Sequence, residues 1–445
     1  LCRCMRYPST RLSHSLNGVP MKKKHYALDK VLVVGTTSDY IDWIQTAYPG
    51  RALFLTEPEV RKKAKESSPD PADELIIRLE NIEFIKKELK KHLEKWNQRI
   101  TGVACFDCES METASVIASK FKVSYPDIQA IQNCRDKYIS KKIWEESGIR
   151  CPAVLPVNSA EEARQFLTKY KNGIVLKPFC GSGSELVFKS KTSEDCDQAF
   201  ETLKKGLVDR EQNRLFNQYT SKNFLMLAEE CIIGSEYSCD FIVDNKNVKI
   251  IRLSRKIKSD SQPFGTVSGY MLPASLPGQM SISGIETVLL NAAQSLGLKR
   301  AICMVDFIVE DHFPVLIEMT PRPGGDCLPF LLKEAGNIDI LGLTLDFAEQ
   351  KTLPVNGYIP FKPHIGLRIH ANKAGVFNGL NTNLLVDDKR VKQIRIIRKP
   401  GHKIIMPPED YDSWLLGHII IEPDNSKYPE TQSLLIRQRL KVEIR

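Results

Sequence analysis

The sequence predicts a fold of the α/β and α+β classes, divided into three parts. Lys30 to Gly35 (KVLVVG) reads as a buried strand that opens an α/β pattern, a helix with its own cap signal begins at Asp136, and short alternating strands follow residue 350. The 445 residues suffice for about three domains of roughly 150 residues each. We therefore expect an N-terminal α/β domain over 28–133, a central domain over 134–350 and a small β-rich C-terminal domain over 351–445.

The composition narrows the class of protein. Hydrophobic residues make up 42% of the chain and charged residues 26%, as in ordinary soluble globular proteins. No apolar run approaches the about 18 residues that a membrane span needs. The formal charge of +9 comes from basic residues that are dispersed rather than gathered in a stripe with aromatics. We therefore expect neither a membrane nor nucleic acid as a partner. Binding of anionic small molecules is enough to explain the net positive charge.

The cysteines and residues 1–20 indicate the cellular compartment in which the protein is expected. The 12 cysteines include one CxxC pair (Cys105, Cys108) and one CxC pair (Cys2, Cys4), without the further ligands that a zinc site requires. Free thiols in a reducing cytoplasm are expected. Residues 1–20 are basic, rich in serine and free of acids, which superficially resembles a transit peptide. We favour Met21 as the functional start and expect residues 1–27 to be a tail without a structural role.

Periodic segments place the remaining elements. In the N-terminal part, Arg51 to Thr56 and Thr101 to Phe106 read as strands, with a long helix over Glu74 to Trp96 between them. No GxGxxG is present, so we assign no dinucleotide site. The later strand candidates are Gly173 to Phe179, Leu186 to Lys189, Phe224 to Ile233, Ser235 to Val243, Ile365 to Ile369, Val391 to Ile397, Lys403 to Met406 and Gly417 to Ile421.

A glycine-serine loop joins the first two of these central strands. Its residues are Gly181, Ser182, Gly183 and Ser184. Glycine lets backbone N–H groups approach a phosphate closely, and serine adds hydroxyl donors. The loop therefore fits a phosphate site. The alternative is a short hairpin turn without a ligand.

A hairpin near residue 312 predicts a pair of facing carboxylates. Two apolar segments, Ala301 to Val309 and Val315 to Met319, flank a turn that we centre on His312. Residues equally distant from that centre pair across the ladder, which sets Asp306 opposite Glu318, about 5 Å apart. Such like charges in an apolar sheet suit a bridging Mg²⁺ that also carries substrate phosphates. The alternative is a slipped register with one carboxylate in solvent.

The residues after this hairpin add an arginine and two glycines. Cys327 to Ala335 reads as a helix, with Asp326 as its N-cap and Gly336 as its stop. Arg322 is then expected close to the metal pair, and Gly324 and Gly325 can present backbone N–H groups to an anion at the helix start. The alternative is that Arg322 pairs structurally with Asp326 and that the two glycines only turn the chain.

Taken in order, these residues resemble the ATP-grasp superfamily over about Lys30 to Pro423. Within it the chain looks most like the carboxylate-amine ligases, particularly L-amino acid ligases and carnosine-synthase-like enzymes. The resemblance implies a three-part ATP-grasp architecture: a pre-ATP-grasp domain, a two-lobed ATP-grasp domain and a β-rich C-terminal domain. The residues that carry it are Asp136, Lys137, Lys177, Pro178, Gly181, Ser182, Gly183, Ser184, Glu229, Glu230, Cys231, Ile232, Glu236, Asp306, Glu318 and Arg322.

The resemblance also implies roles for the nucleotide-binding residues. Lys137 and Lys177 would contact the phosphates of ATP, and Lys177 would also lie near the adenine. Main-chain groups of the hinge at Glu229, Glu230 and Ile232 would read the adenine edge. Glu236 would accept hydrogen bonds from the ribose hydroxyls.

Asp306 and Glu318 match the family's magnesium ligands, and Arg322 its phosphate-stabilising arginine. Many relatives carry Asn as a further ligand two residues after the glutamate; this chain has Thr320 there, a weaker neutral ligand, which the resemblance adds to Asp306 and Glu318 as the third expected metal ligand. Another departure lies in Lys256 to Pro273, where Thr266 and Tyr270 stand in place of the usual Glu and His. Chemistry on the amine side therefore cannot be carried over.

The activity implied is ligation of a carboxylate to an amine with ATP and Mg²⁺, or Mn²⁺ in its place. ATP would phosphorylate the carboxylate, and the amine would displace phosphate from the acyl phosphate. An ATP-dependent carboxylase or another acyl-phosphate former is the alternative among enzymes, and an ATP-binding regulatory protein is the alternative outside them. The expected partners are ATP and two small molecules, and a homodimer is left open.

Overall fold

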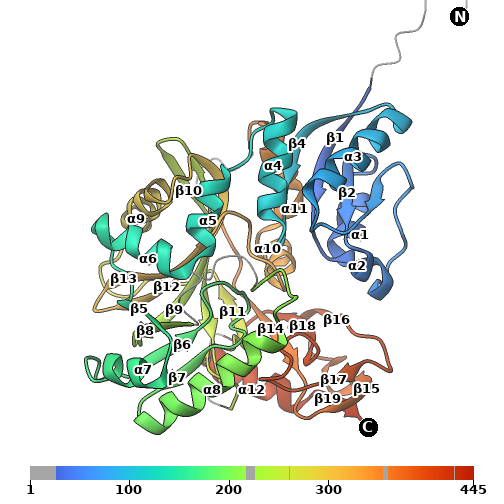
Figure 1. The fold of residues 1–445 in the computed structure, drawn as a ribbon. Coiled ribbons are helices and arrows are strands. Elements are labelled where there is room, and N and C mark those ends of the chain that lie inside the picture. The colour runs from blue at the N-terminus through green and yellow to red at the C-terminus, as the bar shows by residue number, and fades with distance from the viewer. Residues whose placement is uncertain (1–26, 217–225, 260, 354–358, 425) are drawn as a thin grey trace, which may run out of the picture.

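The computed structural model describes residues 27–216, 226–259, 261–353, 359–424 and 426–445. Figure 1 shows an N-terminal unit at the upper right, a body of helices and strands at the left and the last strands at the lower right. The expected tail lies almost entirely outside the described residues, so its lack of a structural role stays a prediction. Within the described residues, no helix combines the length and the apolar character that crossing a bilayer demands.

The N-terminal unit is a parallel four-stranded sheet in the order β3-β2-β1-β4. The run Val31 to Val34 is buried on both faces of the sheet, as continuous apolar strands require. The strands are β1 Leu28–Val34, β2 Ala52–Thr56, β3 Glu74–Ile76 and β4 Gln98–Ala104, and the helices are α1 Ser38–Ala47, α2 Pro58–Lys63, α3 Ile82–Trp96 and α4 Met111–Phe121.

The predicted helix over Glu74 to Trp96 is wrong in its first part. Glu74–Ile76 forms the edge strand β3, and α3 begins only at Ile82 after the N-cap Asn81. A buried strand accepts Glu74 because its carboxylate is satisfied, by the Thr56 hydroxyl at 2.6 Å and the Arg61 guanidinium at 2.6 Å. These partners come from other elements, so local charge pattern could not reveal them.

Two helices lead into the central domain, α5 Ile128–Arg135 and α6 Lys137–Glu146. The carboxylate of Asp136 accepts hydrogen bonds from the backbone N–H groups of Tyr138 at 2.9 Å and Ile139 at 3.0 Å. The predicted cap is therefore confirmed. It places Lys137 in the first turn of α6, where its side chain lines the cleft between the two sheets.

The small lobe, defined here as residues 151–230, is a four-stranded sheet in the order β5-β8-β6-β7 covered by two helices. Its core contains Phe166, Leu176, Leu203 and Met226. The strands are β5 Val154–Val157, β6 Ile174–Lys177, β7 Phe188–Ser190 and β8 Met226–Glu230, and the helices are α7 Ala160–Leu167 and α8 Ser193–Asp209.

The rest of the chain is organised by an antiparallel eight-stranded sheet in the order β13-β12-β9-β10-β11-β14-β18-β16. Its strands are β9 Ser235–Asp244, β10 Asn247–Ile257, β11 Gly269–Leu272, β12 Arg300–Glu310, β13 Phe313–Thr320, β14 His364–His370, β16 Val391–Ile396 and β18 Leu415–Ile421. The sheet continues across the predicted domain boundary at residue 350, because its last three strands come from the C-terminal part.

The remaining elements flank this sheet. They are α9 Ile282–Ser295, α10 Leu328–Gly336, α11 Ile340–Ala348, β15 Gly375–Asn381, a 3₁₀ turn Asn383–Leu385, β17 Lys403–Ile404, α12 Pro429–Gln438 and β19 Lys441–Ile444. Strands β17, β15 and β19 form a separate three-stranded sheet.

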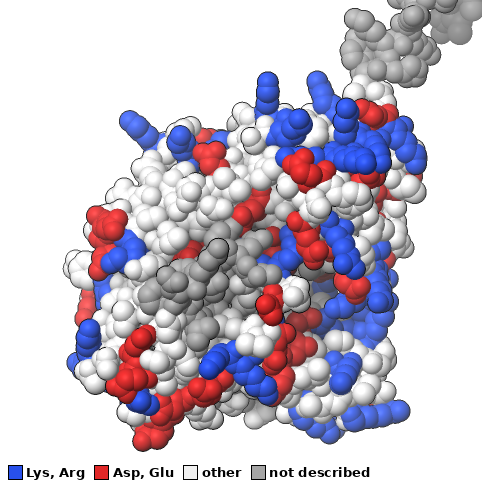
Figure 2. Space-filling model, in the orientation of Figure 1, with Lys and Arg blue, Asp and Glu red and all other residues white. Residues whose placement is uncertain are grey.

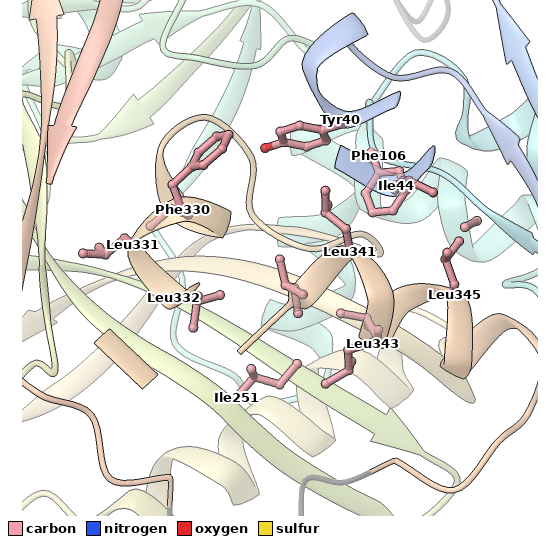
Figure 3. Close-up of a cluster of buried hydrophobic side chains, with 14 of the residues drawn as sticks. Tyr40, Ile44, Phe106, Ile251, Phe330, Leu331, Leu332, Leu341, Leu343 and Leu345 are labelled. Atoms are coloured by element: carbon pink, nitrogen blue, oxygen red, sulfur yellow. The ribbon is translucent and has the colours of Figure 1, made fainter. Parts of the chain in front are cut away.

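One hydrophobic core joins the N-terminal unit to the central domain. Tyr40, Ile44 and Phe106 of the N-terminal unit face the leucines of α10 and α11, with Ile251 of β10 below them (Figure 3). Burial of this shared apolar surface fixes the loops that follow β1 and β4 against the eight-stranded sheet. The surface itself mixes charges of both signs (Figure 2), without a continuous basic stripe on the face shown.

Candidate functional site

A cleft of about 290 Å³ lies between the small lobe and the eight-stranded sheet. It brings together most of the residues expected to bind the nucleotide and the metal, although they come from distant parts of the sequence. The predicted residues that line it are Lys137, Lys177, Gly181, Ser182, Ser184, Glu229, Glu230, Ile232, Glu236, Asp306 and Glu318. Their proximity is observed, whereas their individual roles stay predictions.

The hairpin β12–β13 pairs Asp306 with Glu318, as predicted, but not through the predicted turn. The turn consists of two residues, Asp311 and His312, both with positive φ (47° and 68°), as tight hairpin turns require. That turn alone would pair Asp306 with Ile317. A bulge between Asp306 and Phe307 in the pairing leaves Ile317 as an extra residue of β13 and restores the pair.

The two carboxylates face a set of lysines. Asp306 is buried, and its Oδ2 lies 2.5 Å from Nζ of Lys256, which also contacts Oε1 of Glu236 at 2.6 Å. Glu318 lies 3.5 Å from Nζ of Lys137. Burial raises the pKa of Asp306, only partly offset by Lys256. Burial also opposes ionisation of Glu318, but the surrounding lysines, Lys137 first, outweigh it and lower its pKa.

The pair fits a divalent cation shared with a ligand. Oδ1 of Asp306 is buried and has no hydrogen-bond partner within the described residues, so this carboxylate has an acceptor left over for a ligand. The described part of the chain holds no group of three or more His, Cys, Asp or Glu side chains arranged to bind a metal. A cation here would therefore take only two protein carboxylates and complete its shell with other oxygens, as Mg²⁺ does with substrate phosphates.

Lys177 and Lys141 both bind Glu229 inside the small lobe's wall of the cleft. Nζ of Lys177 lies 2.7 Å and Nζ of Lys141 lies 3.0 Å from the Glu229 carboxylate, and all three side chains are buried. Lys141 also donates to the carbonyl of the bulged Ile317 at 2.7 Å. Burial, its largest cause, lowers the pKa of Lys177 to about 8 despite Glu229. The Glu229 side chain is thus occupied, which leaves its main chain for a ligand.

The glycine-serine loop crosses the cleft and contacts the opposite wall. The Ser184 hydroxyl donates to the carbonyl of Gly265 at 2.8 Å, and Nζ of Lys137 donates to the carbonyl of Gly181 at 3.2 Å. Gly183 has φ of +67°, a conformation that favours glycine. It lies in the loop without lining the cleft.

Arg322 does not lie in this cleft, contrary to the expectation that it sits beside the metal pair. Its Nε and Nη2 donate to Sγ of Cys108, at 3.2 and 3.1 Å, and its Nη1 donates to the carbonyl of Pro323. The backbone N–H of Arg322 donates to the carbonyl of Thr320 at 2.9 Å. This tight turn directs the guanidinium toward the N-terminal unit. Thr320, opposite Met304, likewise does not line the cleft.

Gly324 is not free to bind an anion. Its N–H donates to Oδ1 of Asp240 at 2.9 Å, and a Cβ at this position would lie 2.5 Å from Nη2 of Arg252. Asp240 and Arg252 form a fully buried pair with two hydrogen bonds, of 2.7 and 3.1 Å. Gly325, next to it, also lies outside the cleft. Gly324 therefore serves the close packing of this turn.

The predicted N-cap Asp326 is wrong as well. Cys327 is the N-cap of α10, while Asp326 has φ of +60° and forms an ion pair with Arg368 at 2.8 Å. Arg322 thus does not take Asp326 as its partner. The helix does end with Gly336, but Asn337 adopts the left-handed C-cap conformation.

The buried pair gives a stability prediction. Asp240→Ala leaves the Arg252 guanidinium buried without its carboxylate, so we expect the free energy of unfolding to fall by about 3–5 kcal/mol. Denaturation in urea measures the change. Asp29→Ala, which breaks the exposed pair with Arg99, is the control, with an expected loss of at most about 1 kcal/mol. Equal losses in the two variants would contradict the assigned difference.

Comparison with known proteins agrees with this geometry. Residues 170–329 match the family described as ATP-grasp domain. A D-alanine–D-alanine ligase of Delftia acidovorans is 25% identical over 208 residues, 45% of this chain and 58% of that protein. A probable alpha-L-glutamate ligase of Thioalkalivibrio sulfidiphilus is 24% identical over 232 residues, 51% of this chain and 66% of that protein. The chain thus spans little more than half the length of the D-alanine–D-alanine ligases that it matches.

Two solved structures show the same fold over nearly the whole chain. An L-amino acid ligase from Bacillus licheniformis superimposes with a TM-score of 0.73 at 17% identity, covering 94% of this chain and 99% of that chain. A biotin carboxylase from Campylobacter jejuni superimposes with a TM-score of 0.63 at 15% identity, covering 93% and 92%. The three-part architecture expected from the sequence is therefore confirmed as a fold.

Proposed function

Because the chain contains an ATP-grasp domain, we propose that it is an ATP-dependent ligase that joins a carboxylate to an amine through an acyl phosphate and releases ADP and phosphate. The observation that carries the proposal is the pair Asp306 and Glu318, set face to face in a cleft that also holds Lys137 and Lys177. Relatives named as D-alanine–D-alanine ligase and alpha-L-glutamate ligase support the reaction type.

The cleft divides into a phosphate end and a nucleoside end. Lys137 and Lys177 would neutralise the phosphates, with the loop Gly181 to Ser184 folded over them. The hinge carrying Glu229, Glu230 and Ile232 would read the adenine edge through its main chain. Glu236 contacts Lys256 and Lys258 but keeps further lone pairs, so its carboxylate can also accept from ribose hydroxyls.

Asp306 and Glu318 would hold Mg²⁺, or Mn²⁺ in its place. The ion would supply charge neutralisation at the terminal phosphoryl group. Thr320 stands outside the cleft, so we do not include it among the ligands. Lys256, between Asp306 and Glu236, brings a second positive charge to the same end of the cleft.

The chemistry needs two displacements. An oxygen of the substrate carboxylate attacks the terminal phosphorus of ATP and ADP leaves; the amine nitrogen then attacks the acyl carbon, phosphate leaves and the amine loses a proton. Arg322 would act on the acyl side of this sequence. Its acceptor in the structure, the Cys108 thiol, is a weak one, so an anionic oxygen can replace it at low cost.

The proposal is tested by product analysis. Purified protein with ATP, Mg²⁺ and a panel of carboxylates and amines should release ADP and phosphate in equal amounts, and hydroxylamine should trap the acyl phosphate as a hydroxamate. AMP and pyrophosphate as products would reject the mechanism. Turnover with bicarbonate alone would favour the carboxylase alternative. This alternative is included because the chain shares its fold with a biotin carboxylase. ATP binding without turnover would favour a regulatory protein.

A further inference from the structure

We propose that residues 210–216, the linking segment at the end of α8, couple the nucleotide cleft to the loop that holds Arg322. Arg214 is its central positioning residue. The inference rests on the proposed function, because it concerns how nucleotide binding in the small lobe places a group on the acyl side. A continuous series of contacts among described residues carries it from the glycine-serine loop to the Arg322 guanidinium.

The linking segment holds the glycine-serine loop at both ends. The ring of buried Phe216 lies 3.3 Å from the position that a Cβ on Gly181 would take, so the ring occupies the space directly beside this glycine. Nε of Arg210 donates to Oε1 of Glu185 at 2.5 Å, and Glu185 lines the cleft. Nη2 of Arg210 also donates to the carbonyl of Glu409 at 2.8 Å. A displacement of the glycine-serine loop would therefore also displace the linking segment.

Arg214 then crosses to the N-terminal unit. Its Nη1 donates to Oε1 of Glu57 at 2.8 Å, and its Nη2 donates to the carbonyl of Glu109 at 2.9 Å. The Arg214 side chain is 17% exposed and that of Glu57 26%, so this pair is screened less than a surface pair. Leu215 packs against the cores of both the N-terminal unit and the small lobe.

One of the two residues that Arg214 reaches, Glu109, belongs to the Cys108 loop, defined here as residues 107–110. Arg135 donates to the carbonyl of Cys108 and, at 3.3 Å, to the carbonyl of Leu215. The thiol of Cys108 accepts two hydrogen bonds from Arg322. The Cys108 loop is thus fastened to the linking segment through its main chain and to Arg322 through a side chain.

These contacts make the position of Arg322 depend on the nucleotide. Phosphates in the cleft bind the glycine-serine loop in the arrangement in which Phe216 packs on Gly181, and they favour that arrangement by their own binding free energy. The linking segment, held in turn, fixes the Cys108 loop. The guanidinium of Arg322 is then placed for the acyl group when ATP is bound and is less well placed when the cleft is empty.

Hydrogen exchange with a non-hydrolysable ATP analogue and Mg²⁺ tests the coupling without turnover. In the wild-type protein we expect slower exchange at residues 177–190, around the cleft, and at residues 105–112, which do not line it. Arg214→Ala should keep the first protection and lose the second. Arg214→Lys should retain part of it, and Glu57→Gln should weaken it from the other side. Arg164→Ala, which breaks pairs made within the small lobe, is the matched control and should behave as wild type.

Kinetics adds a readout that a loss of stability would not give. With a substrate found by product analysis, Arg214→Ala should lower kcat by about 10- to 100-fold, as misplacement of an acting group does, with KM for ATP changed by no more than about twofold. Protection at 105–112 that persists in Arg214→Ala, or that is absent from the wild type while 177–190 is protected, would overturn the inference. Absence of protection at both segments would overturn the proposed function and this inference with it.

Discussion

Glu318→Gln is expected to remove nearly all turnover while leaving the fold intact. The side chain is 28% exposed at the cleft, so an amide of the same shape can occupy its place on β13 without a packing change. A neutral amide, however, cannot supply the carboxylate charge that a cation at the terminal phosphate needs. Losing about 3–4 kcal/mol of transition-state stabilisation would lower kcat by roughly 10²- to 10³-fold. ADP release measures the loss, and circular dichroism with thermal melting checks the fold.

Asp306→Asn should lose activity similarly, and it should alter stability more than Glu318→Gln does, because it also removes a charge partner of buried Lys256. Glu310→Gln is the control, because this carboxylate belongs to the same hairpin but pairs with Arg150 outside the cleft. It should retain wild-type kcat. Near-wild-type ADP release by both cleft variants at saturating Mg²⁺ would show that the facing carboxylates do not hold a catalytic cation.

The hairpin β12–β13 shows which features of strand pairing the local sequence can predict. Its apolar strands and intervening turn were sufficient to pair Asp306 with Glu318, but two deviations from the predicted path cancel each other. The turn is centred half a residue earlier than His312, and the bulge at Ile317 adds one residue to β13. Ile317 is an ordinary strand residue, and no glycine or proline marks the bulge. Its carbonyl binds buried Lys141, a tertiary contact that the local sequence does not reveal.

Lys256 was missed although the sequence carries a signal for it. Along β10, Arg252, Ser254 and Lys256 stand at every second position and are all buried, so they share one face of the strand. Polar residues on a buried face indicate a polar network or a ligand site. On this face of β10, Arg252 forms a polar network with Asp240 within the sheet, and Lys256 faces the cleft. Periodicity could have found this face, but not which residue meets which partner.

Arg322 could not be placed from sequence because its direction is set by a distant segment. It follows Glu318 by four positions, which suggested proximity to the metal pair. Its acceptor is Cys108, 214 residues earlier in the chain. The CxxC pair, expected to consist of free thiols, is buried and free of disulfides, as are the other cysteines within the described residues. Cys108 thus serves as a hydrogen-bond acceptor between two domains.

ATP affinity is expected to fall as pH rises through about 8, because of Lys177. Burial lowers the pKa of this ammonium group to about 8, so in the empty cleft it loses its proton above that pH. Only the protonated form attracts phosphate, and binding phosphate in turn favours the proton. Above about pH 8, binding of ATP is therefore accompanied by uptake of one proton at Lys177. Because protons become scarcer as the pH rises, the Kd for ATP should increase by up to about tenfold per pH unit. Below this pH the affinity should be nearly constant.

Calorimetric titration with MgATP between about pH 7 and about pH 9.5 measures this slope. Lys177→Ala should bind more weakly at about pH 7, because it lacks the positive charge, and its Kd should stay flat over the same range, because no proton is taken up at this position. Lys137, in the first turn of α6, would also face the phosphates, and Lys137→Ala should weaken binding while keeping the wild-type slope, because Lys177 is still present to take up the proton. An equal slope in wild type and Lys177→Ala would assign the proton to another group and remove Lys177 from direct contact with the phosphates.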